Sequence, residues 1–538
     1  MLRPGAGGES SARLVEEYVS ASRARWGARR GAAEHRRPFP QEMCGDRPGR
    51  DEYGAKKGGA MTTEQLDVLR DWHAAAGGPL YLRLATALRG AIVEGRLAAN
   101  ERMLSERELG RALALSRSTV VAAYGLLAEW GLAEQRHGSG TWVLPSAARP
   151  PGQRLLHRSS VFERLLRSDA PTIDMALGTA RALRLPGEQH PYMPDAQQVA
   201  ETASAFQFAP AGLPALRRAI AARYAELGLP TTDEQILVTS GAQQAIALLT
   251  QLLVQRGDPA LVESPTYFGA LEILRLNGAQ IHSLPFERLL RSSLAADELI
   301  QRHRPSLVYL TPTCHNPTGA TLPGHVRVGL ARLAAETRVP IVEDETLADL
   351  TIDGQRPPSI ASYPGGEHLI TIGSLGKLFW SGLRVGWVRA DAGLIARLAR
   401  LKIAADLGSG MLDQLVGARL VAASWRAAEL RRAELGARRE LLADLLRELL
   451  PEWEWELPGG GLFIWARLPH GSGQSFAQLA LRCGVAVTPG DQFSADGAHA
   501  AYVRLPFVLD TDELIIGVRR LADAWRRYEQ LAAETVVV

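Results

Sequence analysis

Apolar residues recur at helical spacing within residues 79 to 143, which predicts a small helical unit in the N-terminal part of the chain. They fall mainly on one face of a first helix from Tyr81 to Glu94, which Gly95 ends. Ser105 and Glu108 then form a capping box, because the hydroxyl can accept from the glutamate amide while the carboxylate reaches back. The pattern therefore predicts a second helix that begins at Ser105.

A third helix and a hairpin complete this unit. Ser116 precedes another set of apolar residues at helical spacing and is a suitable N-cap for the third helix. From Leu132 to Val143 the residues alternate on either side of a glycine-rich tip, which predicts a two-stranded wing. Short helix, tight turn, polar-tipped helix and wing follow each other in helix-turn-helix order.

The tips of the third helix and of the wing carry the residue types that a DNA reader needs. Such a reader places cations and small hydrogen-bond donors where they reach phosphates and base edges in the major groove. An ordinary three-helix scaffold with solvated arginines would show much the same spacing, so spacing alone leaves both interpretations open. The candidate DNA-binding residues are Ser105, Arg107, Arg117, Ser118, Thr119, His137 and Gly138.

The unit resembles the winged helix-turn-helix of GntR-type transcription regulators over its whole length. The resemblance rests on the opening Pro79-Leu80-Tyr81, on S-E-R-E-L in the second helix, on S-R-S-T-V in the third and on G-S-G-T-x-V in the wing. It implies binding to double-stranded DNA. Val121 departs from the pattern, because several relatives carry an arginine there, so we expect one DNA contact fewer from this helix.

Short apolar strands alternate with helical segments through the rest of the chain. Strands are predicted at Ile236 to Thr239, Ser306 to Leu310, Pro340 to Val342 and Ile370 to Ile372, and a helix at Ala245 to Leu253. This alternation predicts an open α/β sheet, in which ligands bind at the carboxyl ends of the strands. Polar residues follow each of these strands, so a ligand site is expected at that edge.

Together these polar residues supply what pyridoxal 5'-phosphate requires: an amine, an anion beside the ring nitrogen, a donor to the ring oxygen and a phosphate cup. Lys377 is the candidate amine, Asp344 the partner of the ring nitrogen and Asn316 the donor, while Tyr267 would stack on the ring. Each has an ordinary alternative, such as a core tyrosine or a strand-end cap, and only the combination favours the cofactor. The candidate phosphate-binding residues are Ser240, Gly241, Ala242, Gln243, Ser374 and Arg384.

The order of these motifs resembles the fold-type I, aspartate aminotransferase-like family from about Gln207 to the end of the chain. S-G-A-Q, P-T-Y, H-N-P-T-G, E-D and S-x-G-K-x-x-x-x-G-L-R follow in family order, and G-G-G-L-F-I-W and Y-V-R-L resemble parts of its small domain. The resemblance implies an α/β fold with a mostly parallel sheet plus a small α+β domain. It also implies that Arg504 takes the α-carboxylate of an amino compound, since a guanidinium binds a carboxylate through two hydrogen bonds.

Two positions depart from the family pattern, and both lose a hydroxyl group. Leu347 stands three residues after Asp344, where the family usually has a tyrosine that hydrogen-bonds the ring oxygen. Phe206 or Phe208 stands where relatives carry a tyrosine that reaches the phosphate in the partner subunit. We therefore expect covalent cofactor binding through Lys377 to remain while efficient turnover is reduced.

Composition narrows the class of protein without changing this assignment. The chain of 538 residues has a net charge of +3, with 46% hydrophobic and 22% charged residues, as in ordinary folded proteins. No run of about 18 apolar residues and no secretory signal pattern occurs. Cys44, Cys314 and Cys483 lie too far apart for a disulfide framework or a cysteine zinc site. We expect a cytoplasmic protein with no membrane span and no metal.

Changes in composition divide the chain into four parts. Residues 1 to 60 are expected to be a disordered extension, and Met61 opens a capped helical pattern that is the expected natural start. The winged helix-turn-helix is assigned to residues 61 to 143, and a stiff basic linker with three prolines to residues 144 to 171. The aminotransferase-like domain is assigned to residues 172 to 538, with its small domain from about residue 395.

This domain order resembles the MocR subfamily of bacterial transcription regulators. The resemblance implies a homodimer that binds operator DNA and carries pyridoxal 5'-phosphate. It also implies an amino-compound effector that replaces Lys377 on the cofactor, so that closure through Arg504 repositions the DNA readers. An active aminotransferase with an N-terminal DNA-binding appendage is the alternative function. The presence of Lys377 argues against a regulator that has lost the cofactor.

Overall fold

The structure is a computed structural model. It describes residues 79–93, 97, 101–130, 132–136, 140–144, 172–183, 192–206 and 208–536. The expected extension and most of the linker lie outside the described residues, as do His137 and Gly138 at the wing tip. The chain divides into two compact units, an N-terminal unit of residues 1–149 and a C-terminal unit of residues 150–538, which are considered separately.

The N-terminal unit is the winged helix-turn-helix that the sequence predicts. Ser105 caps the second helix with the complete capping box, and Ser116 caps the third by accepting a hydrogen bond from the Thr119 amide at 3.1 Å. Tyr124 and neighbouring apolar residues of the three helices form its core, and the Tyr124 hydroxyl donates to the Leu104 carbonyl. The elements are α3 (Leu80–Val93), α4 (Glu106–Ala112), α5 (Arg117–Glu129), β1 (Ala133–Arg136) and β2 (Gly140–Val143), with β1 and β2 antiparallel.

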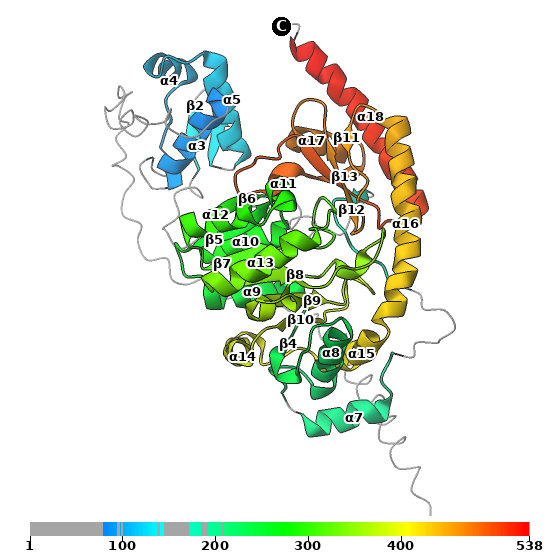
Figure 1. The fold of residues 1–538 in the computed structure, drawn as a ribbon. Coiled ribbons are helices and arrows are strands. Elements are labelled where there is room, and N and C mark those ends of the chain that lie inside the picture. Colours follow the sequence, from blue (N-terminus) through cyan, green and yellow to red (C-terminus); the bar gives the residue numbers. More distant parts are fainter. Residues whose placement is uncertain are drawn as a thin grey trace, which may run out of the picture. The chain divides into compact units, whose positions relative to one another are not determined.

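A seven-stranded sheet forms the centre of the C-terminal unit (Figure 1). Its order is β4-β10-β9-β8-β7-β5-β6, and all strands are parallel except β10, which runs antiparallel to both neighbours. This confirms the predicted open and mostly parallel sheet. The strands are β4 (Ile236–Thr239), β5 (Pro259–Ser264), β6 (Gln280–Pro285), β7 (Leu307–Leu310), β8 (Ile341–Asp344), β9 (Ile370–Ser374) and β10 (Gly386–Arg389).

Two apolar clusters cover the faces of this sheet, as expected for a sheet buried on both sides. β8 runs two residues further than predicted, so Asp344 is the last residue of the strand rather than part of the following loop. The helices connected with the large sheet are α8 (Pro214–Glu226), α9 (Ala242–Leu253), α10 (Phe268–Asn277), α11 (Phe286–Arg291), α12 (Leu294–His303), α13 (Gly324–Thr337) and α14 (Ala392–Asp406).

A second sheet, with the order β11-β12-β14-β13-β3, forms the small domain. β3 (Ile173–Met175) comes from the start of this unit and pairs in parallel with β13, so the small domain includes residues far upstream of position 395. Its other strands are β11 (Glu454–Trp455), β12 (Phe463–Arg467), β13 (Val485–Pro489) and β14 (Tyr502–Pro506). The remaining helices are α7 (Ala196–Ala205), α15 (Met411–Ala422), α16 (Ser424–Leu449), α17 (Gly473–Arg482) and α18 (Thr511–Val536).

Short 3₁₀ turns join several of these elements: η1 (Asp233–Gln235), η2 (Ala348–Leu350), η3 (Ile360–Ser362), η4 (Gly366–His368) and η5 (Gly490–Phe493). Within the described ranges, no helix has the length and apolar character needed to cross a membrane. The same ranges contain no group of three side chains that could hold a metal ion.

Candidate functional site

The predicted phosphate cup lies in the turn between β4 and α9. Gly241 has φ of 90°, a conformation that glycine adopts without strain, and a Cβ there would lie 2.6 Å from Nη2 of Arg384. Arg384 donates through Nη2 to the Ser240 carbonyl at 2.6 Å. α9 begins at Ala242, three residues before the predicted start. As in every helix, its first amides have no partner within the helix. A guanidinium beside free helix amides fits a phosphate group.

Ser374 closes β9 on the neighbouring side of the cup. Its hydroxyl donates to the Val385 carbonyl at 3.1 Å and accepts from the Gly376 amide at 3.1 Å. These two hydrogen bonds shape the tight turn that leads from β9 to Lys377. The structure therefore shows a role of Ser374 that was not predicted, in the shape of the turn, while its predicted contact with a phosphate stays a prediction.

Lys377 is half-buried, and its amine reaches the segment that follows β3. Its Nζ donates to the Gly178 carbonyl at 2.7 Å. Burial, with the nearby positive charges of Arg504 and Arg384, lowers the pKa of Lys377 to about 8. A lysine with a pKa near neutrality keeps part of its population as the free amine, which is the form that reacts with an aldehyde.

Asp344 lies at the end of β8 and is buried. Its Oδ2 accepts from the Tyr309 hydroxyl at 2.6 Å, and its Oδ1 accepts from the Thr346 amide at 2.8 Å. Burial raises the pKa of Asp344, and these hydrogen bonds oppose that rise. The arrangement suits a carboxylate that pairs with a protonated ring nitrogen. Tyr309 was not predicted, because inside an apolar strand it looks like any core residue.

The Tyr267 ring lies over the start of α10 and close to the phosphate cup. Its hydroxyl donates to Oε1 of Gln243 at 2.8 Å, and a Cβ at Gly269 would lie 2.5 Å from the ring. Burial, followed by the charge of Asp344, raises the pKa of Tyr267 to about 12. The ring is therefore neutral and held in place at physiological pH, as a stacking residue must be.

Arg504 on β14 is buried and reaches from the small domain to the large one. Nη1 donates to Oδ1 of Asn316 at 3.0 Å, and Nη2 donates to the Ala176 carbonyl at 2.7 Å. Its guanidinium carbon lies 3.8 Å from the ring centre of Phe463. Burial lowers the pKa of Arg504 to about 9, and within the described residues its Nε has no hydrogen-bond partner. A buried cation with an unused donor is suited to an anionic ligand.

The two expected hydroxyl losses hold in the structure. Leu347 is buried and packs into the apolar core, so it supplies no donor to the site. Phe208 is 64% exposed and lies after α7, away from any core cluster.

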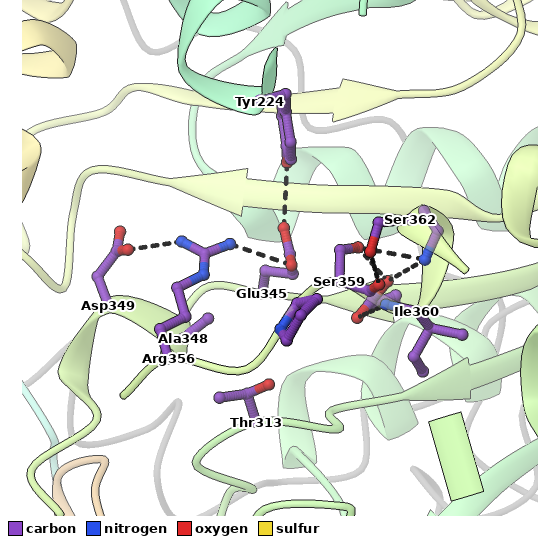
Figure 2. Close-up of polar contacts among 12 residues, drawn as sticks. Tyr224, Thr313, Glu345, Ala348, Asp349, Arg356, Ser359, Ile360 and Ser362 are labelled. Atoms are coloured by element: carbon purple, nitrogen blue, oxygen red, sulfur yellow. Dashed lines mark hydrogen bonds and ion pairs between the residues drawn. The ribbon is translucent and has the colours of Figure 1, made fainter. Parts of the chain in front are cut away.

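Glu343 and Glu345, the neighbours of Asp344 in sequence, make other polar contacts, and Figure 2 shows those of Glu345. Arg356 bridges Glu345 at 3.0 Å and Asp349 at 2.6 Å, and the Tyr224 hydroxyl donates to Glu345 at 3.3 Å (Figure 2). Glu343 accepts from the Ser359 hydroxyl at 2.6 Å, and burial raises its pKa. These contacts anchor the residues at the end of β8. They could not be predicted from the sequence, because the residues that form them are scattered along the chain.

Of the candidate DNA-binding residues that the structure describes, Ser105, Arg107, Arg117 and Ser118 are exposed and Thr119 is half-buried. Arg117 donates through Nε and Nη2 to Oε2 of Glu106 at 3.1 and 3.0 Å. Ser105 and the hydroxyl of Thr119 take part in local hydrogen bonds at the helix starts. Their role in DNA contact stays a prediction.

Family models match both units. The model of aminotransferases of class I and II matches residues 186–521. The model of bacterial regulatory proteins of the gntR family matches residues 80–143. Aminotransferases of this class depend on pyridoxal 5'-phosphate, so the cofactor predicted from the strand-end residues is confirmed at the level of the family.

Two relatives match this chain over most of their own length, and both are named as regulators. YdfD, an HTH-type transcriptional regulator of Bacillus subtilis (strain 168), is 29% identical over 455 residues, covering 80% of this chain and 92% of YdfD. The probable rhizopine catabolism regulatory protein MocR of Rhizobium meliloti is 28% identical over 405 residues, covering 70% of this chain and 78% of MocR.

Among solved structures, LysN is an α-aminoadipate aminotransferase from Thermus thermophilus in complex with N-(5'-phosphopyridoxyl)-L-leucine. It matches with a TM-score of 0.59 and 29% identity, covering 70% of this chain and 96% of LysN. This chain thus resembles an aminotransferase in its C-terminal unit and regulators over most of its length.

Proposed function

Because the chain belongs to the aminotransferase class I and II family and, through its gntR-type unit, to the MocR subfamily of transcription regulators, we propose that it senses an amino compound. Binding of that compound in the C-terminal unit changes the affinity of the N-terminal unit for operator DNA. The effector is an amino acid or a close analogue, because the site pairs a reactive amine with a buried arginine.

One observation carries this proposal: the two cations proposed to act on an amino acid, Lys377 and Arg504, both donate to the same short segment. Lys377 donates to the carbonyl of Gly178, and Arg504 donates to the carbonyl of Ala176. A carboxylate that binds Arg504 competes with the Ala176 carbonyl for the same guanidinium. Binding of a ligand would therefore change the contacts of the segment that follows β3. β3 itself is the first described element after the linker.

The residues have separate tasks. When bound, pyridoxal 5'-phosphate supplies an aldehyde carbon that condenses with an amine. Lys377 would hold that carbon, and with a pKa of about 8 roughly a tenth of the free lysine is neutral at pH 7. Asp344 would pair with the ring nitrogen, Tyr267 would cover one face of the ring and Asn316 would donate to the ring oxygen. A Lys377 amine that is not joined to the cofactor would donate a hydrogen bond to the Gly178 carbonyl, as it does in the structure.

A homodimer is part of the proposal. Large apolar side chains are exposed around α7 and the start of α15 and α16, and the two helices α7 and α15 contact each other. The exposed fractions of Phe208, Leu412 and Trp425 are 64%, 58% and 68%. Groups of exposed apolar side chains are typical of protein–protein interfaces. Light scattering of the purified chain tests this, with a mass of two chains expected and a monomer as the contradicting result.

An active aminotransferase is the second candidate function, because Lys377, Asp344, Asn316 and Arg504 are all present and Arg504 donates to Asn316. Against it stands Leu347, whose side chain offers no donor to the ring oxygen. A steady-state assay with common amino donors separates the two functions. An enzyme turns over about 1 to 1000 times per second, whereas a sensor is far slower.

The proposal is tested by titrating purified protein with amino acids while absorbance of the bound cofactor and binding to its own promoter region are recorded together. We expect one class of amino compound to change both signals. If no amino compound changes the spectrum, the proposed sensing function is wrong.

A further inference from the structure

The lysines of this chain are few, and their placement is unusual. Lys+Arg total 61, of which only Lys56, Lys57, Lys377 and Lys402 are lysines. The C-terminal unit thus contains two lysines, and neither lies on its open surface. Lys377 is accounted for by the cofactor. Lys402 on α14 has no solvent exposure and no part in the chemistry described so far.

Lys402 belongs to a hydrogen-bonded network behind the phosphate cup. Its Nζ donates to Oδ2 of Asp406 at 2.6 Å and to Oε1 of Gln244 at 3.0 Å. The same Gln244 oxygen accepts from the Ser240 amide at 2.8 Å. Gln244 also donates to Asp406 at 2.7 Å, so the buried charge is paired and hydrogen-bonded. The network connects the end of α14 to the turn that carries the phosphate site.

The loop after α14 is fixed from both of its ends. The Gly408 amide donates to Oδ1 of Asp406 at 2.9 Å, on the side of the Lys402 network. On the other side, the buried Gln414 donates to the Ser409 carbonyl at 2.8 Å and accepts from the Leu213 amide at 2.6 Å. A loop anchored in this way presents the side chain of Ser409 in one position.

That position faces the phosphate cup. Oγ of Ser409 lies 3.5 Å from Oγ of Ser240. This separation is wider than an ordinary hydrogen bond between hydroxyls, which is about 2.7 to 2.8 Å. The two hydroxyls are therefore neighbours whose hydrogens remain available to a common acceptor. Ala242 provides no hydroxyl in the first turn of α9, so Ser409 supplies a second one where the helix does not.

We propose that Ser409 is a further residue of the phosphate site, donating its hydroxyl to the phosphate monoester of the cofactor, and that Lys402 and Asp406 position it. The inference rests on the placement of the cofactor phosphate at Ser240 to Gln243 proposed above. Lys402 acts through Asp406 and Gln244, since its amine is engaged by both and makes no contact of its own with the turn.

The test compares pyridoxal 5'-phosphate with pyridoxal, which lacks the phosphate. Ser409→Val removes the hydroxyl, and Ser409→Thr keeps it in a side chain of the same size and shape as valine, so the two variants form a matched pair. Equilibrium dialysis and calorimetry with full-length protein should show about 10-fold weaker binding of the phosphate form to Ser409→Val, as expected for loss of a hydrogen bond to a charged group. Pyridoxal affinity should stay unchanged in both variants, and Ser409→Thr should bind the phosphate form like the parent.

Equal affinity of Ser409→Val and the parent for pyridoxal 5'-phosphate would overturn the proposal. An equal loss for pyridoxal would also overturn it, because the effect would then not come from the phosphate. If the parent protein itself binds neither compound, the proposed function fails. This result differs from a parent protein that binds pyridoxal 5'-phosphate with the same affinity as Ser409→Val.

The positioning role is tested by a double-mutant cycle. Lys402→Met alone should weaken binding of pyridoxal 5'-phosphate about 10-fold, and it should add nothing in the Ser409→Val background, because the hydroxyl it positions is gone. Asp406→Asn serves as the second variant, since it retains size and should give the same pattern if Lys402→Met does not fold. Additive losses in both double variants would overturn the positioning role of Lys402 and Asp406.

Discussion

The two units place their candidate functional residues in opposite surroundings. In the C-terminal unit, Arg504 is buried and Lys377 half-buried, and each donates to a carbonyl of the segment after β3. In the N-terminal unit, Arg107 and Arg117 are exposed, and Arg117 pairs with the adjacent Glu106 across the helix-turn-helix. One set is fixed by the fold before any ligand arrives, whereas the other is free to adapt to a DNA surface.

This difference has consequences for what a substitution does. Removal of a buried cation leaves its former partners unpaired in an apolar setting, so large and specific effects are expected. Removal of an exposed arginine should affect the binding of its ligand and hardly affect the stability of the protein, because surface ion pairs contribute little to stability. The predictions below use this contrast, and they run from the largest expected effect to the smallest.

Lys377→Ala should abolish the covalent link to the cofactor completely, since the other lysine among the described residues, Lys402, has its amine engaged by Asp406 and Gln244. Borohydride reduction of the parent protein followed by peptide mapping should find the label on Lys377. Lys402 is the internal control, because it is buried but engaged by Asp406. A label on Lys402, or on no lysine, contradicts the cofactor assignment.

Arg504→Ala should lower affinity for the amino effector by at least about 30-fold, because truncation of one member of a buried charge pair costs about 2 to 5 kcal/mol. The visible spectrum of the bound cofactor should be retained. Arg467→Ala is the matched control, as Arg467 lies on neighbouring β12 but is exposed and forms an ion pair with Glu454. Equal effector affinity in the Arg504→Ala and Arg467→Ala proteins would remove Arg504 from the effector site.

Arg117→Ala should weaken binding to the operator by about 1 to 3 kcal/mol, or roughly 5- to 150-fold, and leave the cofactor spectrum unchanged. Quantitative gel-shift or anisotropy titrations at fixed salt measure this. Arg111→Ala, at the exposed end of α4, controls for loss of one positive charge. If both variants lose the same affinity, Arg117 acts only through net charge and does not read bases.

The rate of cofactor uptake by protein freed of cofactor should depend on pH through Lys377. Its pKa of about 8 lies below that of an ordinary lysine, because burial and nearby arginines disfavour the charged form. The reactive neutral fraction therefore falls about tenfold per pH unit below that value and levels off above it. Stopped-flow absorbance over a pH range that brackets this pKa should show this, and Arg504→Ala should move the midpoint upward. A rate independent of pH contradicts the assignment.

Ser105→Ala should destabilise α4 by about 1 kcal/mol, the usual value of an N-cap, and thus raise local amide exchange about fivefold. Hydrogen exchange of the α4 segment in the full-length protein measures this. Ser118→Ala is the control, because its hydroxyl contacts Ser116 but caps no helix. Identical exchange in the two variants would show that the capping box does not stabilise this helix.

The contrast between the units also explains what could be predicted from the sequence. Ser105 and Ser116 cap helices through residues three positions away, so their role is visible in a short window. The order of strand-end motifs likewise predicted the sheet and the residues along its carboxyl edge. Both kinds of prediction rely on neighbours in sequence.

Contacts between distant parts of the chain were missed. Lys377 and Arg504 each donate to a backbone carbonyl, 199 and 328 residues away, and a carbonyl has no sequence signature. β3 is three residues long and pairs with the distant β13, so nothing local marked it as a strand of the small domain. Lys402 and Ser409 were missed because their relevance depends on where the loop after α14 meets the turn at Ser240.

The central claim is that occupation of the buried site alters DNA binding by the exposed one. The most direct test is one titration of the full-length protein with an amino effector, in which cofactor absorbance and operator affinity are measured on the same samples. The account predicts that both signals change with the same midpoint. A spectral change that reaches saturation while operator affinity stays constant would contradict it.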